Sequence, residues 1–188
     1  MPMTIQPQAG QPLSSRFDGS SGPRIVGPLD GQFAHLRSLG VRFMAWNTDT
    51  GGGFSVVEHP IPPRTLVAPL HRHEREDEYS FVLEGTMGAQ LGDDVVVANV
   101  GDFAFKPRRQ WHTFWNAGDT PCRILKIISP AGFEHFFKEL DALMRATGAP
   151  NPGLALAGSD LPKRYAIEFK PESIEALCER HGLVYPAA

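Results

Sequence analysis

Residues 71–85 read HRHEREDEYSFVLEG, and residues 101–116 read GDFAFKPRRQWHTFWN. Together they supply three histidines and one glutamate that form a candidate ligand set: His71, His73, Glu78 and His112. Imidazole nitrogens and carboxylate oxygens are ligands that divalent transition metals take in proteins. The sequence therefore predicts one divalent metal ion per chain, bound by these four residues. The set suits Fe, Mn, Ni, Co, Cu or Zn and does not select among them.

The same segments have the periodicity of β-strands. His71 and His73 are two positions apart, so on an extended strand both side chains leave the same face. Residues 79–83 alternate Tyr, Phe and Leu with Ser and Val, which is also typical of a strand. His112 begins a third segment of this kind. Three strands that deliver ligands to one interior indicate a barrel or a sandwich.

Short strand-like segments separated by turn residues continue on both sides of these segments. Glycine-rich turns, such as residues 51–53 and 92–94, interrupt them. This spacing predicts an all-β barrel or jelly roll. The expected strands cover residues 41–46, 54–59, 64–73, 78–84, 87–91, 95–98, 102–105, 112–116 and 123–128.

The pattern changes to a helical period after the last of these strands. Apolar residues at helical spacing predict a helix over residues 131–146 that packs against the outside of the barrel or, through its phenylalanines, covers a pocket. Residues 147–162 have the composition of a loop, and a short helix is expected from about Pro171 to Gly182. We expect a flexible N-terminal segment (1–23), a barrel (24–130) and a helical extension packed on it (131–188).

Composition excludes several classes of partner. The chain has 188 residues and a formal net charge of −3, so no basic surface for nucleic acid is expected. No apolar run approaches the roughly 20 residues that span a bilayer. Residues 1–23 lack the apolar core of a signal peptide, so we expect no membrane association and a cytoplasmic protein.

We expect the remaining histidines and the two cysteines to have structural roles. His59 lies on an expected strand and could line a cavity, but we expect it to pack or to face solvent. Cys122 and Cys178 are not in a C-x-x-C pair, so they are expected to be free thiols.

The two segments resemble the two sequence motifs of the cupin superfamily, G-x5-H-x-H-x3,4-E-x6-G and G-x5-P-x-G-x2-H-x3-N. His71, His73, Glu78 and Gly85 match the first, although Leu66 or a neighbour replaces its opening glycine. Gly101, Pro107, His112 and Asn116 match the second. Its internal glycine is Arg109 here, which is disfavoured by roughly 1 kcal/mol if the turn needs a positive φ.

The resemblance implies a cupin-type double-stranded β-helix. Residues 49–54 and 128–137 extend it to single-domain cupins related to monocupin quercetin 2,3-dioxygenases. It then implies a metal-dependent dioxygenase that uses dioxygen to cleave a flavonol-like or other enolisable aromatic or phenolic substrate. Glu78 would be the catalytic residue, a fourth ligand that can leave the metal and accept a proton from the substrate hydroxyl. Exposed edge strands and the resemblance also suggest a homodimer.

Two other functions remain open on the sequence. One is a non-redox isomerase, lyase or hydrolase in which the metal polarises a carbonyl. The other is a cupin that binds a small molecule without turnover. Substrate-dependent oxygen uptake separates the dioxygenase from both.

Overall fold

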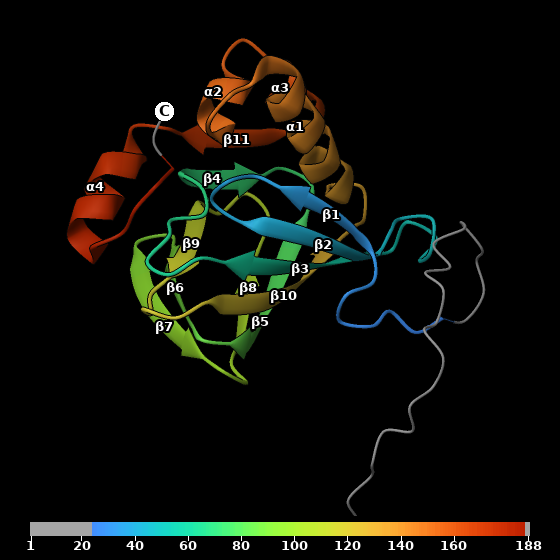
Figure 1. The fold of residues 1–188 in the computed structure, drawn as a ribbon, viewed down its shortest axis with the longest axis horizontal. Helices are drawn as coiled ribbons and strands as arrows, with labels where there is room; N and C mark the ends of the chain where they lie inside the picture. Colours follow the sequence, from blue (N-terminus) through green and yellow to red (C-terminus); the bar gives the residue numbers. More distant parts are fainter. Residues whose placement is uncertain (1–23, 187–188) are drawn as a thin grey trace, which may run out of the picture.

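The computed structural model describes residues 24–186 and shows two antiparallel sheets closed into a barrel, with helices gathered beyond one end (Figure 1). One sheet has the strand order β1-β2-β3-β10-β5-β8, and the other has the order β11-β4-β9-β6-β7. The strands are β1 (Gln32–His35), β2 (Gly40–Ala45), β3 (Ser55–Ile61), β4 (Leu70–His73), β5 (Asp77–Glu84), β6 (Thr86–Leu91), β7 (Asp94–Asn99), β8 (Phe103–Lys106), β9 (His112–Asn116), β10 (Cys122–Ser129) and β11 (Ile167–Lys170). This confirms the predicted jelly-roll barrel with C-terminal helices. The segment predicted to be flexible, residues 1–23, lies outside the described residues.

Alternation along the central strands decides which side chains face the barrel interior. In β10 every second residue is buried, beginning with Cys122 and Ile124. In β5 the buried positions include Glu78 and Ser80, whereas Phe81 is exposed. Polar residues therefore enter the barrel interior at positions that the strand period would assign to apolar side chains.

The nine strands expected from the sequence are all present, but one is much shorter than predicted. Of residues 64–73, only Leu70–His73 form a strand, and Thr65 and Leu66 make isolated bridges. Pro69 interrupts the segment because proline has no N–H to donate to a sheet. The four-residue strands β1 and β11 were not predicted, because each is too short to show a clear period.

The C-terminal part contains four helices, α1 (Glu134–Thr147), α2 (Pro152–Leu156), α3 (Leu161–Arg164) and α4 (Ser173–His181). The buried face of α1 includes Phe136, Phe137 and Leu140, which join the same core cluster as Val41 and Phe43 of the barrel. The helix ends at Gly148, whose φ is 67°. No helix within residues 24–186 is both long and apolar enough to cross a membrane.

The expectation of a continuous loop over residues 147–162 was wrong. Pro152 occupies the first turn of α2, and the side chain of Asn151 accepts a hydrogen bond from the Leu154 N–H at 2.9 Å. Proline at the first position and a capping asparagine are both start signals for a helix. Between α3 and α4, β11 pairs with β4, so the segment after residue 130 also completes a sheet of the barrel.

Arg109 keeps the turn that the motif glycine would make. Its φ is +66°, and its N–H donates to the carbonyl of His73 at 2.7 Å. The side chain is exposed and its Nε lies 3.1 Å from Glu74. The turn therefore keeps the left-handed conformation that favours glycine, with an arginine in its place.

Replacing Arg109 by glycine is expected to raise the free energy of unfolding by about 1 kcal/mol, since the strain of a side chain at positive φ disappears. The lost ion pair with Glu74 is exposed and offsets little of this gain. Urea denaturation of both proteins measures the difference. Arg108→Gly is the matched control, because Arg108 is not among the positive-φ residues and pairs with Asp77, so this variant should lose stability. Equal losses in the two variants would contradict the argument.

Candidate metal centre

Strands from both sheets bring the four predicted ligands together inside the barrel. His71 and His73 come from β4, His112 from β9 and Glu78 from β5. His71 and His112 are direct partners across β4 and β9. All four side chains are buried, and one ligand atom from each can be chosen so that all lie within 4.8 Å of one another. The sequence spacing thus placed the cluster correctly.

The hydrogen bonds of the histidines leave ligand atoms pointing inward. His71 Nδ1 lies 2.9 Å from the carbonyl of Pro69, and His112 Nδ1 lies 3.0 Å from the carbonyl of Gln110. A carbonyl only accepts, so in both neutral rings Nδ1 carries the hydrogen and Nε2 carries the lone pair. Nε2 of His73 and of His112 has no hydrogen-bond partner among the described residues. Buried polar atoms are seldom left in this state, and a metal ion between them would satisfy both.

Burial also keeps the imidazoles in the form that binds metals. It lowers the pKa of His71 well below the ordinary value of 6.5 and lowers the pKa of His112 as well. Both rings are therefore neutral at pH 7, and no proton must leave before a metal binds.

Glu76 is a neighbour of the cluster that the sequence interpretation missed. It belongs to an acidic run, Glu74, Glu76 and Asp77, that would ordinarily face solvent, yet Glu76 is buried and its Oε2 lies 3.6 Å from Nδ1 of His73. That separation is too long for a hydrogen bond but suits a charge that orients the imidazole. Its spacing of three residues from His73 is the signal that could have identified it.

Two buried lysines hold Glu78 and were not anticipated either. Lys126 donates from Nζ to Oε1 of Glu78 at 2.8 Å, and Nζ of Lys106 lies 2.9 Å from Oε2. Both ammonium groups also lie over the ring of Phe114, at 4.4 and 4.6 Å from its centroid. Lys126 is two positions from both Ile124 and Ile128, so the strand period of the sequence already indicated that it shares their inward face.

The lysines determine the charge of the carboxylate. Burial by itself would raise the pKa of Glu78, but the positive charges of Lys106 and Lys126 outweigh it and hold that pKa well below its usual range. Burial lowers the pKa of Lys126 to about 7, against the opposing attraction of Glu78. Glu78 is thus an anion at neutral pH, as a metal ligand must be.

A cavity of about 570 Å³ opens beside the cluster. His71, His73, Glu78 and Lys126 contribute polar atoms to its wall, and most of the remaining lining is apolar. Phe133 packs edge-on against His73, with ring centroids 4.3 Å apart. The phenylalanines of α1 and the residue before it therefore line the cavity as well as the core.

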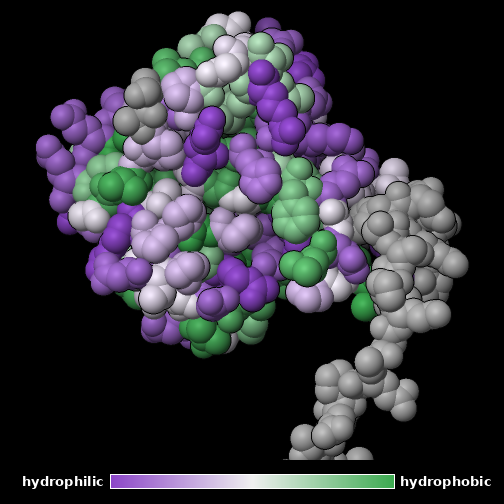
Figure 2. Space-filling model, in the orientation of Figure 1, coloured by the Kyte–Doolittle hydropathy of each residue, from purple (hydrophilic) through white to green (hydrophobic). Residues whose placement is uncertain are grey.

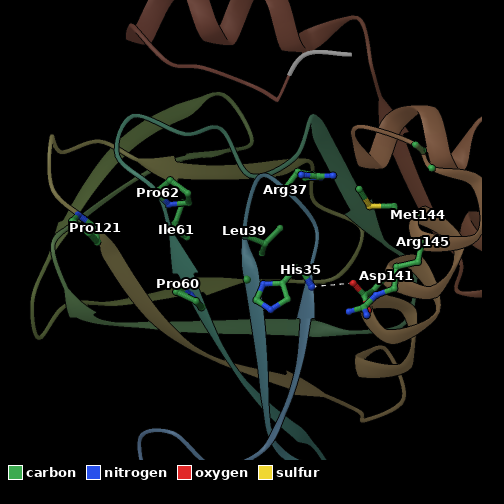
Figure 3. A pocket seen from close by; sticks show the side chains of 13 residues that line it. His35, Arg37, Leu39, Pro60, Ile61, Pro62, Pro121, Asp141, Met144 and Arg145 are labelled. Atoms are coloured by element: carbon green, nitrogen blue, oxygen red, sulfur yellow. Dashed lines mark hydrogen bonds and ion pairs between the residues drawn. The ribbon is translucent and has the colours of Figure 1, made fainter.

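A second hollow of about 640 Å³ lies on the outside, between the β1–β2 hairpin, the end of β3 and α1 (Figure 3). The backbone N–H of His35 donates to the Asp141 carboxylate there at 3.1 Å. Although it is larger, none of its lining residues belongs to the His/Glu cluster. The 570 Å³ cavity is the candidate active site because three residues of the cluster, His71, His73 and Glu78, line it.

The fold is that of a cupin-type double-stranded β-helix, and the comparisons agree with it. Residues 58–128 match the family model for the Cupin domain. This segment is therefore similar to a Cupin domain. This segment contains all four residues of the cluster. No curated protein sequence matches it.

Solved structures show the same fold at low sequence identity. KdgF from Halomonas sp. aligns with a TM-score of 0.54 and 14% identity over 61% of this chain and 99% of its own. A predicted oxalate decarboxylase from Thermotoga maritima aligns with a TM-score of 0.52 and 20% identity over 57% and 99%. An RmlC-like cupin from Shewanella frigidimarina aligns with a TM-score of 0.52 and 17% identity over 61% and 96%. At these identities the similarity concerns the fold alone.

Proposed function

We propose that the protein is a metal-dependent dioxygenase, similar to quercetinases, that cleaves an enolisable or phenolic aromatic substrate. The observation that carries this proposal is the buried His/His/Glu/His cluster, three of whose residues line a largely apolar, phenylalanine-lined cavity. Cavities of this size and lining hold small molecules with an apolar body. A phenolic or enolic oxygen could then meet the cluster while its ring lies against the aromatic wall.

Each residue of the cluster has a role in this proposal. His71, His73 and His112 hold the metal, and Glu78 is the fourth ligand and the acceptor of the substrate hydroxyl proton. When bound, a redox-active transition metal supplies the electron transfer that reaction with dioxygen requires. Phe133 and Phe136 stack on each other with centroids 4.9 Å apart and present aromatic surface that excludes water and contacts a ring.

The proposal is tested by oxygen consumption. Elemental analysis of protein purified without chelators identifies the bound metal, and an oxygen electrode then screens phenols, flavonols and diketones with the metal-loaded protein. We expect oxygen uptake that depends on both substrate and metal. Product formation that is unchanged under nitrogen would replace the proposal by a non-redox isomerase or lyase. Saturable binding without any product would replace it by a binding protein.

We also propose that the protein forms a homodimer through an apolar face on β5 and β8. Phe81, Phe103 and Phe105 are 38%, 60% and 48% exposed, and Tyr79 stacks on Phe105 at 5.0 Å. β8 is an edge strand of its sheet, so a second copy could cover both the aromatic side chains and the free backbone groups. Figure 2 shows hydrophobic residues at the lower end of the barrel, where β5 and β7 lie in Figure 1.

Phe103→Glu is expected to convert the dimer to a monomer, because a carboxylate at the centre of this face would be buried without a partner. Light scattering at micromolar concentration measures the mass. Val97→Glu is the matched control: Val97 is 62% exposed on β7, the edge strand of the other sheet, and its replacement should leave the dimer intact. A wild-type monomer would refute the dimer, and a dimeric Phe103→Glu would refute this face.

A further inference from the structure

Two polar side chains outside the proposed ligand set enter the candidate active site from neighbouring strands. His59 comes from β3 and Lys126 from β10, and both line the 570 Å³ cavity. In the β3–β10 register His59 is opposite Ile124, and Lys126 is opposite Val57. His59 and Lys126 are therefore diagonal neighbours on the inward face, a spacing at which long side chains reach each other.

The hydrogen bonding of His59 leaves one nitrogen available to a ligand. The side chain is fully buried, and its Nδ1 lies 3.1 Å from the carbonyl of Gly40. Since that carbonyl only accepts, Nδ1 carries the hydrogen and Nε2 is an acceptor. Burial, reinforced by the nearby charge of Lys126, lowers the pKa of His59 to about 3, so the ring is neutral.

Nε2 of His59 has no partner among the described residues. The ring is held in place by Phe114 and Phe137, whose centroids lie 6.2 and 5.3 Å away. A fixed, buried acceptor that lacks a donor is costly, and the cavity is where a donor can approach it. The expectation that His59 only packs or faces solvent was therefore incomplete: it packs, and it also presents an acceptor to the site.

The charges around Lys126 favour an anion. Glu78 is the only acidic residue in the cavity lining, and it faces two ammonium groups, those of Lys106 and Lys126. A divalent cation held by the cluster would add two positive charges beside Lys126, and the one carboxylate of the lining does not balance them. A bound anion would balance this excess.

We propose that His59 and Lys126 form a recognition pair for an aromatic hydroxy acid, in which His59 Nε2 accepts a hydrogen bond from a hydroxyl other than the one that Glu78 deprotonates, and Lys126 Nζ donates to the carboxylate adjacent to it. The phenylalanine-lined wall holds the ring. The inference rests on the proposed function and narrows its substrate class from any enolisable aromatic compound to one that carries a hydroxyl beside an anionic oxygen.

Three small probes separate the parts of this pair. Mandelate carries a ring, a hydroxyl and a carboxylate, whereas phenylacetate lacks the hydroxyl and mandelamide lacks the charge. Calorimetry with the full-length protein, both metal-free and loaded with redox-silent Zn²⁺, measures their binding. We expect mandelate to bind about 3- to 10-fold more tightly than phenylacetate and about 10- to 100-fold more tightly than mandelamide, from the loss of one neutral and one charge-assisted hydrogen bond respectively.

Variants assign each preference to its residue. His59→Leu should abolish the preference for mandelate over phenylacetate, and His59→Gln, which keeps an acceptor, should restore part of it. Lys126→Met should weaken mandelate and phenylacetate equally, and mandelamide less than either. His35→Leu, in the outer hollow of Figure 3, is the control and should change none of these affinities.

The result that overturns the inference is equal affinity of the wild type for mandelate and phenylacetate, or no saturable mandelate binding at all. The probe comparison uses unaltered protein, so it decides the matter even if a variant fails to fold. Binding needs neither dioxygen nor turnover, so failure of the dioxygenase proposal is seen separately. Oxygen uptake with neutral phenols and no preference for anions would overturn this inference alone.

Discussion

Alanine at His71, His73 or His112 is expected to reduce metal affinity by more than about 100-fold. Loss of only a hydrogen bond to a metal-bound histidine already reduces affinity by roughly 10- to 100-fold. Each replacement removes one of only four ligand atoms that lie within 4.8 Å of one another. Elemental analysis and competition with a chromophoric chelator measure the stoichiometry and the dissociation constant. The three single variants should behave alike, because each donates one imidazole nitrogen.

His35→Ala is the control for this experiment, because His35 is exposed and lies outside the cluster. It should bind one ion per chain as tightly as the wild type does. A variant without all three clustered histidines that still holds a full equivalent of metal would show that the metal binds elsewhere.

Glu78→Gln is expected to lower the free energy of unfolding of the metal-free protein by about 3 kcal/mol, the lower end of the range for breaking a buried ion pair. The amide leaves Lys106 and Lys126 without a counter-charge at 2.8–2.9 Å. Because the pKa of Lys126 is already about 7, it can lose its proton, which limits the cost. Urea denaturation at constant pH measures the effect.

The double variant Glu78→Gln/Lys126→Met is the matched control. It removes one of the two unpaired ammonium groups and should recover part of the lost stability, since buried ion pairs are often replaced by apolar groups at little cost. Stability of Glu78→Gln within about 0.5 kcal/mol of the wild type would contradict a structural role for the pair of lysines.

Turnover in the same Glu78→Gln variant tests the catalytic role. If Glu78 accepts the substrate proton, turnover should fall by about two to four orders of magnitude while the three histidines keep most of the metal. Metal content must be measured on the same sample. Unchanged turnover with normal metal content would show that Glu78 is only a ligand.

Local patterns were sufficient to predict much of the fold and the clustering of three histidines with Glu78. Alternation identified nine strands, because a strand with one buried face repeats every two residues. The cluster followed from the same period, since His71 and His73 share a face and His112 opens a strand of its own. Strands β1 and β11 were not predicted. They are defined by their pairing with β2 and β4, and a segment of four residues does not reveal such pairing.

The partners of the cluster could not be predicted in the same way. Lys106 and Lys126 meet Glu78 only because β8 and β10 lie on either side of β5. This adjacency is a property of the sheet order, and no spacing along the chain encodes it. The free nitrogen of His59 likewise depends on a carbonyl of β2 that occupies its other nitrogen.

The pairing of β11 with β4 has a consequence for biosynthesis. β4 carries His71 and His73, and Ile167 of β11 is the residue that pairs with His73. On the ribosome, the strand that holds two of the ligands therefore keeps an open edge until residues 167–170 have emerged from the exit tunnel. The proposed metal site is therefore complete only late in synthesis or after it. Until that moment the uncovered edge is a surface on which nascent chains can aggregate.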